Sequence, residues 1–558
     1  MTHRPSSHRL VVSLMLGVAA CSSDQGTGLA PCTASRGTAV TLAVGKYTSI
    51  DPTTDGGCVV IAANASTIDT AEYLLAPQSA AGTFGDSFPF SLRGAAAGAA
   101  AAVTTLRVAA PAPPSTAERF DALLRRMGRA RSYPAPPLTP PAGAAPRASV
   151  AAGPPVVGTV RSFKVCAVLD CSQFQQVTGV VKTVGAHIAI YVDTMAPPGG
   201  LDSADLDTLK QLFDTRLFPL DTATFGAVSD IDNNGVVIVL MTNVVNALVT
   251  ASQCMSAGYV TGFFFAGDLD PRFSTAYNHG EVFYSLVADP LGTLSCPHQA
   301  SQVKSVLPGT FVHELQHMIS FDQHVLVLGA SAEEGWLDEG LSKYAEELAG
   351  RSFLPGDTTS FQNYVHADLT DAYQYLEAPA SAPLLIEYDD GTIPEIGASW
   401  LFVRYLMDQG PTALPRMLDQ SSLTGSANVA AQMGTPFPTL VARWALANWV
   451  SDLPGFTASP ELTYTSWRFR STYASLNAKD PSHFPMAFPL VPSSSDGPSV
   501  NVSGELHSGS TFYYRALQAP AAPAFTLSFS VNGGGLPGFL GAHLATFVAA
   551  RLTIIRIR

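Results

Sequence analysis

The chain is short of positive charge. Its 558 residues include 31 lysines and arginines against 44 aspartates and glutamates, which gives a formal net charge of −13. Basic clusters are confined to Arg125-Arg126 and the last few residues. Proteins that bind nucleic acids need a positive surface against the phosphate backbone. The sequence therefore argues against a nucleic-acid partner.

Cysteine is also scarce. None of the seven cysteines belongs to a Cys-x-x-Cys pair, so we expect no cysteine-based zinc or redox site. The apolar tail, residues 539–558, is interrupted by His543, Arg551 and Arg556, which makes it a poor membrane span. The sequence contains no internal repeat of the kind that would indicate a solenoid. A chain of this length can hold about three domains and a large core.

The N-terminus has the layout of an export signal. Arg4 and Arg9 precede an apolar stretch from Leu10 to Ala20. This stretch is too short to cross a membrane as a stable helix. We therefore predict a signal peptide over residues 1–20.

The end of that signal, Val18-Ala19-Ala20-Cys21, resembles a bacterial lipobox, in which the cysteine is lipidated and becomes the mature N-terminus. Ser22 follows, a residue that favours the outer membrane in a Gram-negative cell. We expect an exported lipoprotein of the bacterial cell envelope or surface, attached to the membrane through this lipid only. The alternative is a plain secretory signal with an incidental cysteine.

The other six cysteines are an even number in an exported chain, which favours three disulfides. Six cysteines allow fifteen pairings. Pairing the cysteines that lie close in the sequence gives Cys32 with Cys58, Cys166 with Cys171, and Cys254 with Cys296.

The segment from Thr310 to Ile319 carries the main chemical signal. His313 and His317 are four residues apart, so on a helix both rings leave one face and can hold one Zn²⁺. Glu314 between them can hold a water against the metal as the general base. Pro308-Gly309 is a plausible start for this helix. The alternative is an ordinary core helix whose histidines fall four apart by chance.

A third ligand is available from a second expected helix, residues 333–348, whose apolar residues recur at three- and four-residue spacing. Acidic residues crowd its first turns, as the helix dipole favours. Four of its carboxylates could reach a metal: Glu333, Glu334, Asp338 and Glu339.

These two segments, His313-Glu-Leu-Gln-His317 and Trp336-Leu-Asp-Glu-Gly-Leu-Ser-Lys-Tyr-Ala-Glu-Glu347, resemble the gluzincin group of zinc peptidases. The resemblance implies that Glu339 is the third zinc ligand. The wider match is to the hyicolysin-type neutral metallopeptidases and spans about residues 160 to 450. It also includes the segments Asp230–Leu240, Gly258–Phe263 and Gly397–Leu406.

The sequence departs from the gluzincin pattern in two ways. Asp338 stands where many gluzincins have Asn, which adds a carboxylate beside the ligand. The separation of His317 from Glu339 is slightly longer than in the aminopeptidase-N branch.

The resemblance also suggests roles for neighbouring residues. Glu346, two helical turns after Glu339, would orient a ligand histidine; the alternative is a solvated surface acid. His324 is interpreted as structural or outer-shell, because a catalytic site needs an open position. An oxyanion-stabilising Tyr or His is also expected, and the sequence does not rank the candidates. These are Tyr364, His366, Tyr373, Tyr375 and Tyr388.

Asp230, Asp232, Asn234 and Gly235 copy the first half of a calcium-binding loop. The closing glutamate of such a loop would fall on Met241, so the pattern is incomplete. Ca²⁺ is a candidate second metal, and a tight turn entering a strand is the alternative.

The expected fold class is α+β: a gluzincin-like catalytic domain with a β-containing N-lobe and a helical C-lobe, flanked by small β-rich modules. The expected divisions are the signal peptide (1–20), a β-rich N-terminal module (21–110), a helix and Pro/Ala-rich linker (111–155), the metallopeptidase domain (156–470) and a C-terminal β-rich module (490–558). The region before the catalytic domain is either a tether or a removable propeptide.

We therefore predict an exported zinc metalloendopeptidase that acts on proteins or peptides with one catalytic Zn²⁺. The endopeptidase prediction rests on the resemblance and on the absence of the Gly-x-Met-Glu-Asn segment that captures a free amine in aminopeptidases. The alternatives are a zinc exopeptidase and a surface binding or adhesion lipoprotein on an inactive peptidase scaffold.

Overall fold

The computed structural model describes Cys32 and residues 37–83, 87–96, 115–133, 153–385, 392–531 and 549–558. The predicted signal peptide, the lipidation site Cys21 and most of the predicted linker lie outside the described residues. No helix in the described ranges is long and apolar enough to cross a membrane.

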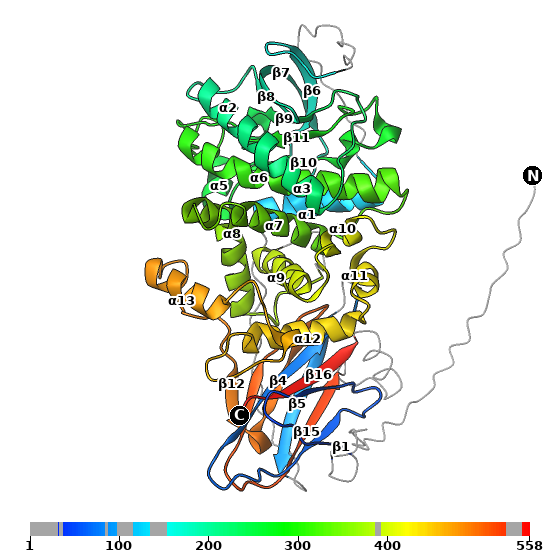
Figure 1. Cartoon of the computed structure of the whole chain (residues 1–558), viewed down its shortest axis with the longest axis vertical. Coiled ribbons are helices and arrows are strands. Elements are labelled where there is room, and N and C mark those ends of the chain that lie inside the picture. Colours follow the sequence, from blue (N-terminus) through cyan, green and yellow to red (C-terminus); the bar gives the residue numbers. More distant parts are fainter. Residues whose placement is uncertain are drawn as a thin grey trace, which may run out of the picture.

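The chain is arranged in three tiers along its long axis (Figure 1). A six-stranded sheet with flanking helices forms one end, a helical layer lies in the middle, and a β-sandwich forms the other end. This mixed α and β architecture agrees with the predicted α+β class.

The six-stranded sheet has the order β10-β11-β9-β8-β7-β6. Its strands are β6 (Val160–Cys166), β7 (Phe174–Val184), β8 (Ile188–Asp193), β9 (Val237–Met241), β10 (Gly262–Phe264) and β11 (Val282–Ser285). The β8–β9 and β9–β11 pairs are parallel, and the other pairs are antiparallel. Every residue of β9 is buried, as its uninterrupted apolar run predicts. β10 forms an edge beside the helical layer.

Residues 179–192 are mostly apolar and form parts of both strands of a hairpin, β7 and β8. The turn at Gly185 separates β7 from β8 because Ala186 N–H and His187 N–H donate to the carboxylate of Asp214. A Cβ at Gly185 would lie 2.0 Å from that carboxylate, so a larger residue there would displace the group that holds the turn. The apolar periodicity runs through both strands and gives no signal for the turn between them.

Helices cover this sheet and form the middle tier. Before the helix that carries His313 and His317, which we call the metal-site helix, these are α1 (Thr116–Ala130), α2 (Ser203–Leu212), α3 (Phe218–Thr224), α4 (Asn243–Asn246) and α5 (Ala251–Ala257). A π-helical turn, η1 (Phe213–Leu217), joins α2 to α3. From the metal-site helix onward they are α6 (Ala300–Phe321), with the π-helical turn η4 (Asp322–Val327), then α7 (Gly335–Arg351), α8 (Thr358–Glu377), α9 (Ile393–Gln409), α10 (Leu414–Asp419), α11 (Gly425–Met433), α12 (Phe437–Val450) and α13 (Phe469–Lys479). Short 3₁₀ turns lie at η2 (Ala266–Asp268), η3 (Pro271–Phe273), η5 (Pro460–Leu462) and η6 (Gly497–Ser499).

The start predicted for the metal-site helix at Pro308-Gly309 is wrong. Helix α6 begins at Ala300 and continues through Pro308. Val303 and Leu307 are buried on the same apolar stripe as Phe311, so packing holds the earlier turns in the helix. Proline only weakens a helix locally, and this packing outweighs its cost.

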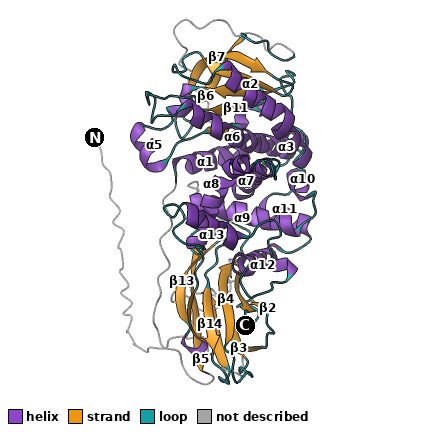
Figure 2. Cartoon of the chain, turned by 60° about the vertical axis from the view of Figure 1, so that its left-hand side comes forward, coloured by secondary structure: helices purple, strands orange, loops and turns teal. Residues whose placement is uncertain are grey.

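The two β-rich regions at opposite ends of the chain do not form two modules; they form one sandwich (Figure 2). Its sheets have the orders β1-β3-β15-β5-β13 and β12-β14-β4-β16-β2. The strands are β1 (Thr38–Val40), β2 (Tyr47–Ile50), β3 (Cys58–Ile61), β4 (Ala71–Ser79), β5 (Ser87–Ala96), β12 (Ser493–Asp496), β13 (Asn501–His507), β14 (Tyr514–Gln518), β15 (Phe525–Val531) and β16 (Ala550–Arg556). Each sheet mixes N-terminal and C-terminal strands, and their inner faces share one core. Alternation places strands but does not identify their partners, which is why sequence reasoning separated the two regions.

All three expected disulfides are present: Cys32–Cys58, Cys166–Cys171 and Cys254–Cys296. The first closes a loop within the N-terminal part of the sandwich, and the third fixes α5 to the segment that leads into α6.

The mixed sandwich makes a testable prediction. β16 lies between β4 and β2, so deleting residues 549–558 leaves both N-terminal strands without a partner on that side. We expect the amide protons of β2 and β4 to lose their protection from hydrogen exchange, while those of the six-stranded sheet keep theirs. Unchanged protection in β2 and β4 would mean that the N-terminal strands fold without the C-terminal ones.

Candidate metal centre

Two imidazoles from α6 and one carboxylate from α7 converge on a point. The Nε2 atoms of His313 and His317 lie 3.1 Å apart, and oxygens of Glu339 lie 3.4 Å and 3.5 Å from them. Tetrahedral zinc, with ligand distances of about 2.0–2.1 Å, places its ligand atoms roughly 3.3 Å apart. The three side chains therefore fit a zinc ion, and they can hold a metal.

Helix packing explains why Glu339 reaches the histidines. The next residue, Gly340, lies where α7 crosses α9, and a Cβ there would be 2.6 Å from Val403 and 2.9 Å from the Ser399 carbonyl oxygen. Only glycine permits this close approach. Leu337 and Leu341 are deeply buried, and Glu339, which lies between them in the sequence, faces α6.

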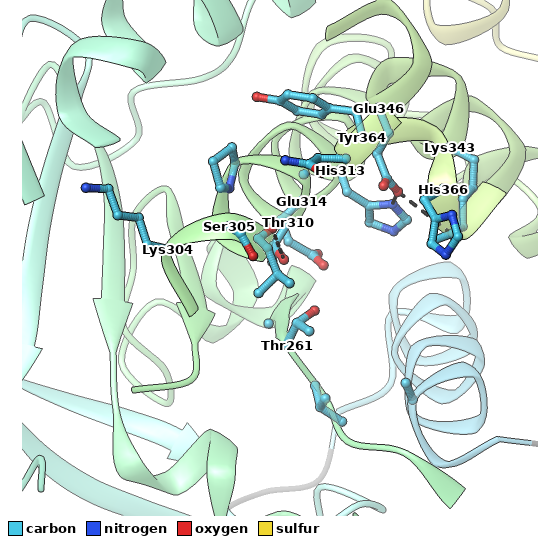
Figure 3. A pocket seen from close by; sticks show the side chains of 18 of the residues that line it. Thr261, Lys304, Ser305, Thr310, His313, Glu314, Lys343, Glu346, Tyr364 and His366 are labelled. Carbon is cyan, nitrogen blue, oxygen red and sulfur yellow. Dashed lines mark hydrogen bonds and ion pairs between the residues drawn. The ribbon is translucent and has the colours of Figure 1, made fainter. Parts of the chain in front are cut away.

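Each histidine is oriented by a carboxylate on its other ring nitrogen; Figure 3 shows the pair His313 and Glu346. His313 Nδ1 is 2.8 Å from Glu346, and His317 Nδ1 is 2.9 Å from Asp338. The Ser342 hydroxyl is 3.0 Å from the same nitrogen of His317. Such contacts place the proton on Nδ1 and leave the Nε2 lone pair directed at the ligand point. The resemblance predicted this role for Glu346 and gave no such role to Asp338, which stands where many gluzincins have Asn.

The charges of the cluster compensate one another. Burial lowers the pKa of His313, but the carboxylates of Glu339 and Glu346 outweigh it and hold this pKa well above its usual value. Burial raises the pKa of Glu339, but His317 and His313 outweigh it and hold that pKa well below its usual range. A divalent cation supplies the same positive charge at the same point in place of the imidazole protons.

Glu314 lies beside the cluster and is 3% exposed. Its Oε2 accepts a 2.7 Å hydrogen bond from the backbone N–H of Phe264 in the edge strand β10. This bond fixes the carboxylate at the wall of the cleft that His313 and Glu339 also line.

Arg125 on α1 is a further component of the site that sequence analysis missed. Its side chain is 7% exposed, with Nη1 3.6 Å from Asp338 and Nε 3.9 Å from Glu339. Its Nη2 donates to the carbonyl oxygen of Phe264 at 3.2 Å. The sequence predicted a helix in this region. It gave no signal that the helix packs against the ligands, because the contact joins residues more than 200 positions apart.

The metal cluster opens into a cleft of about 900 Å³. Lys304 and Thr310 of α6 lie along it, and Lys343 lies on the far side of His313 (Figure 3). Glu118 and Asp121 of α1 line it as well. The cleft therefore presents both acidic and basic side chains next to the ligand point.

The other candidate ligands lie elsewhere. Glu333 accepts from Gly425 N–H and the Asn428 side chain. Glu334 accepts from Arg129 and from the indole N–H of Trp336. His324 is buried, with Nε2 3.7 Å from Glu333, and takes no part in the cluster.

Two of the five proposed oxyanion donors, Tyr364 and His366, line the cleft. The hydroxyl of Tyr373 is engaged with the backbone of Met486, and Tyr375 stacks on Trp444 in the core. Tyr388 lies outside the described residues.

The expected calcium ligands are not part of the zinc-type cluster. Asp230 and Asp232 form a separate acidic group with Glu281, a residue that sequence analysis did not consider. Asn234 and Gly235 form the turn that follows these aspartates.

The chain was compared with known proteins. No family model matches the chain. The chain is similar to the neutral metalloprotease ShpI of Staphylococcus hyicus, with 31% identity over 140 residues. The match covers 24% of this chain and 29% of that relative, so the chain matches less than a third of the relative's length. This supports a relationship to metallopeptidases; the narrower hyicolysin-type assignment stays a prediction.

Loss of the orienting carboxylates should weaken metal binding. We expect Asp338→Ala to lower zinc affinity about 10- to 100-fold, because His317 loses the acceptor that fixes its ring. Asp338→Asn, which keeps an acceptor oxygen, should lose less. Competition with a chromogenic chelator measures both affinities. Glu334→Ala, at the N-cap of the same helix but without an imidazole contact, is the matched control, and equal affinities in Asp338→Ala and this control would contradict the role of Asp338.

Proposed function

We propose that the protein is a zinc metallopeptidase of the hyicolysin type, with His313, His317 and Glu339 as the ligands. The observation that carries this proposal is the convergence of the three ligand atoms beside a fixed glutamate in an open cleft. When bound, zinc lowers the pKa of its water and polarises the substrate carbonyl. The similarity to a neutral metalloprotease supports the same reaction class.

Glu314 is the general base of the proposed reaction. The N–H of Phe264 holds its Oε2, so Oε1 is the oxygen available to the cleft. This carboxylate takes the proton from the attacking water and passes it to the leaving amine. Glu346 and Asp338 keep the imidazoles in place while charge develops in the transition state.

Endopeptidase activity is the first choice for specificity, on the basis of the resemblance and the absent amine-capturing segment. A specific observation supports exopeptidase activity as the second choice: Glu118 and Asp121 line the cleft, and a carboxylate pair can attract the free amino group of a peptide. Cleavage of an N-acetylated peptide and of the same peptide with a free N-terminus separates the two. Equal rates favour the endopeptidase, and cleavage of the free peptide alone favours the exopeptidase.

The cellular placement proposed from sequence is a lipoprotein anchored through Cys21. In a bacterial host, the wild-type protein should partition into detergent on phase separation, and Cys21→Ala should move it to the aqueous phase. Aqueous partitioning of the wild type would favour a plain secretory signal.

The roles of Glu314 and Glu339 can be separated by substitution. Glu314→Gln should keep zinc but lower casein hydrolysis by about 10²- to 10⁴-fold, because the amide cannot accept a proton. Glu339→Ala should lose both zinc and activity. Metal content by mass spectrometry and casein cleavage with and without a chelator measure both effects. Undiminished turnover in Glu314→Gln would remove it from the mechanism, and full zinc content in Glu339→Ala would assign the ligand to another acid.

The oxyanion donor is proposed to be Tyr364 or His366, the two candidates that line the cleft. We expect either Tyr364→Phe or His366→Ala to lower kcat about 10²-fold with little change in KM. Tyr373→Phe is the matched control, because its hydroxyl bonds to the backbone away from the cleft. If both cleft variants match this control, the donor lies elsewhere.

A further inference from the structure

Three carboxylates lie close together where two neighbouring strands of the six-stranded sheet begin. The turn Asp230–Gly235 leads into β9, and Glu281 directly precedes β11. β9 and β11 are parallel neighbours, with Ile238 opposite Val282, so their starts lie side by side. The backbone bond from Ile238 N–H to the Glu281 carbonyl, at 2.7 Å, holds them there.

The turn itself does not decide whether an ion binds. Asp230 Oδ1 accepts from Gly235 N–H at 3.1 Å, and Asp232 accepts from the backbone and side chain of Asn234. Bonds of this kind shape many turns without a metal. The independent observation is that one carboxylate oxygen of Glu281 is buried without a hydrogen-bond partner.

Glu281 is 1% exposed and only half satisfied. Its Oε1 accepts from the Ser229 hydroxyl at 2.7 Å and from Ile231 N–H at 2.9 Å. Its Oε2 is buried without a hydrogen-bond donor. A buried carboxylate oxygen without a donor is costly, and a bound cation removes that cost.

The surroundings carry an excess of negative charge. Asp230, Asp232 and Glu281 each offer an oxygen within 4.8 Å of the others. Arg161 contacts this group, with Nη1 3.4 Å from Asp232, and its other Nη donates to the Asn278 carbonyl. One guanidinium therefore faces three carboxyl groups.

We propose that Asp230, Asp232 and Glu281 bind a calcium ion, and that Glu281 is the closing carboxylate that the linear calcium-loop pattern lacks. Ca²⁺ prefers oxygen ligands at about 2.3–2.6 Å, and three oxygens that lie within 4.8 Å of one another can contact one such ion. The exposed carboxylate of Asp230 leaves the remaining coordination positions open to water. The ion would join the starts of β9 and β11 in the sheet whose edge strand fixes Glu314.

The test uses the full chain, zinc-loaded, in the Glu314→Gln background so that self-cleavage is excluded. CaCl₂ is titrated by calorimetry, and thermal unfolding is followed with and without calcium. We expect one calcium to bind, and a calcium concentration of about 100 times Kd to raise Tm by about 3 °C. MgCl₂ should give a smaller shift, because Mg²⁺ demands stricter geometry. Neither readout depends on peptidase activity.

The decisive variant is Glu281→Gln. Its amide oxygen can keep the bonds to Ser229 and Ile231, while its NH₂ group in place of Oε2 cannot bind a cation. We expect calcium affinity to fall at least 10-fold and the Tm shift to disappear. Asp289→Asn is the matched control, because Asp289 is equally buried and accepts from a hydroxyl and a backbone N–H without belonging to the group.

Two results would overturn the proposal. One is a wild-type Tm that calcium does not change. The other is a Glu281→Gln protein that binds calcium as tightly as the Asp289→Asn control. If Glu281→Gln does not fold, Asp230→Asn replaces it, because Asp230 is exposed and its loss should spare the fold. The same 10-fold loss is then required for the proposal to stand.

Discussion

The contact between α6 and α7 is the constraint on which the site depends. Two imidazoles on α6 meet Glu339, Asp338 and Glu346 on α7, and each ring is held from both of its nitrogens. These groups are buried, so every charge must be matched locally. Sliding one helix along the other by one turn would leave several buried carboxylates without partners. The same contacts that create the ligand point therefore also fix the register of the two helices.

The neighbouring elements extend this constraint outward. Phe264 of β10 donates its N–H to Glu314 and accepts from Arg125 through its carbonyl oxygen. One residue of an edge strand thus joins the proposed base to the cation that faces Asp338 and Glu339. A shift of this strand would move Glu314. It would also move Arg125 away from the carboxylates of Asp338 and Glu339, whose charge it balances. This explains why rigid packing below β10, where Phe263 contacts Phe120 and Tyr284, matters for the chemistry.

Local sequence patterns predicted part of the fold and part of the site. The spacing of His313 and His317 required only a helix, and burial of the apolar residues around them supplied it. The choice of Glu339 among four nearby carboxylates came from resemblance, because helical periodicity alone cannot tell which acid faces a distant helix. Arg125 and Glu281 were beyond reach for the same reason: each acts through contacts with residues remote in the sequence. Strand positions in the sandwich followed from alternation, whereas their pairing depended on which surfaces bury each other.

The sandwich bears on the role of the region before the catalytic part of the chain. β4 lies between β14 and β16, and β5 lies between β15 and β13, so N-terminal strands fill interior positions of both sheets. Cleavage of the chain after α1 would leave these strands held by their ladders and by the common core. Their release would expose that core and the unpaired edges of four C-terminal strands, at a cost in the range of a domain's unfolding free energy. Helix α1 belongs to the same region and brings Arg125 to the ligands, so this region contributes both to the sandwich core and to the surroundings of the ligand point.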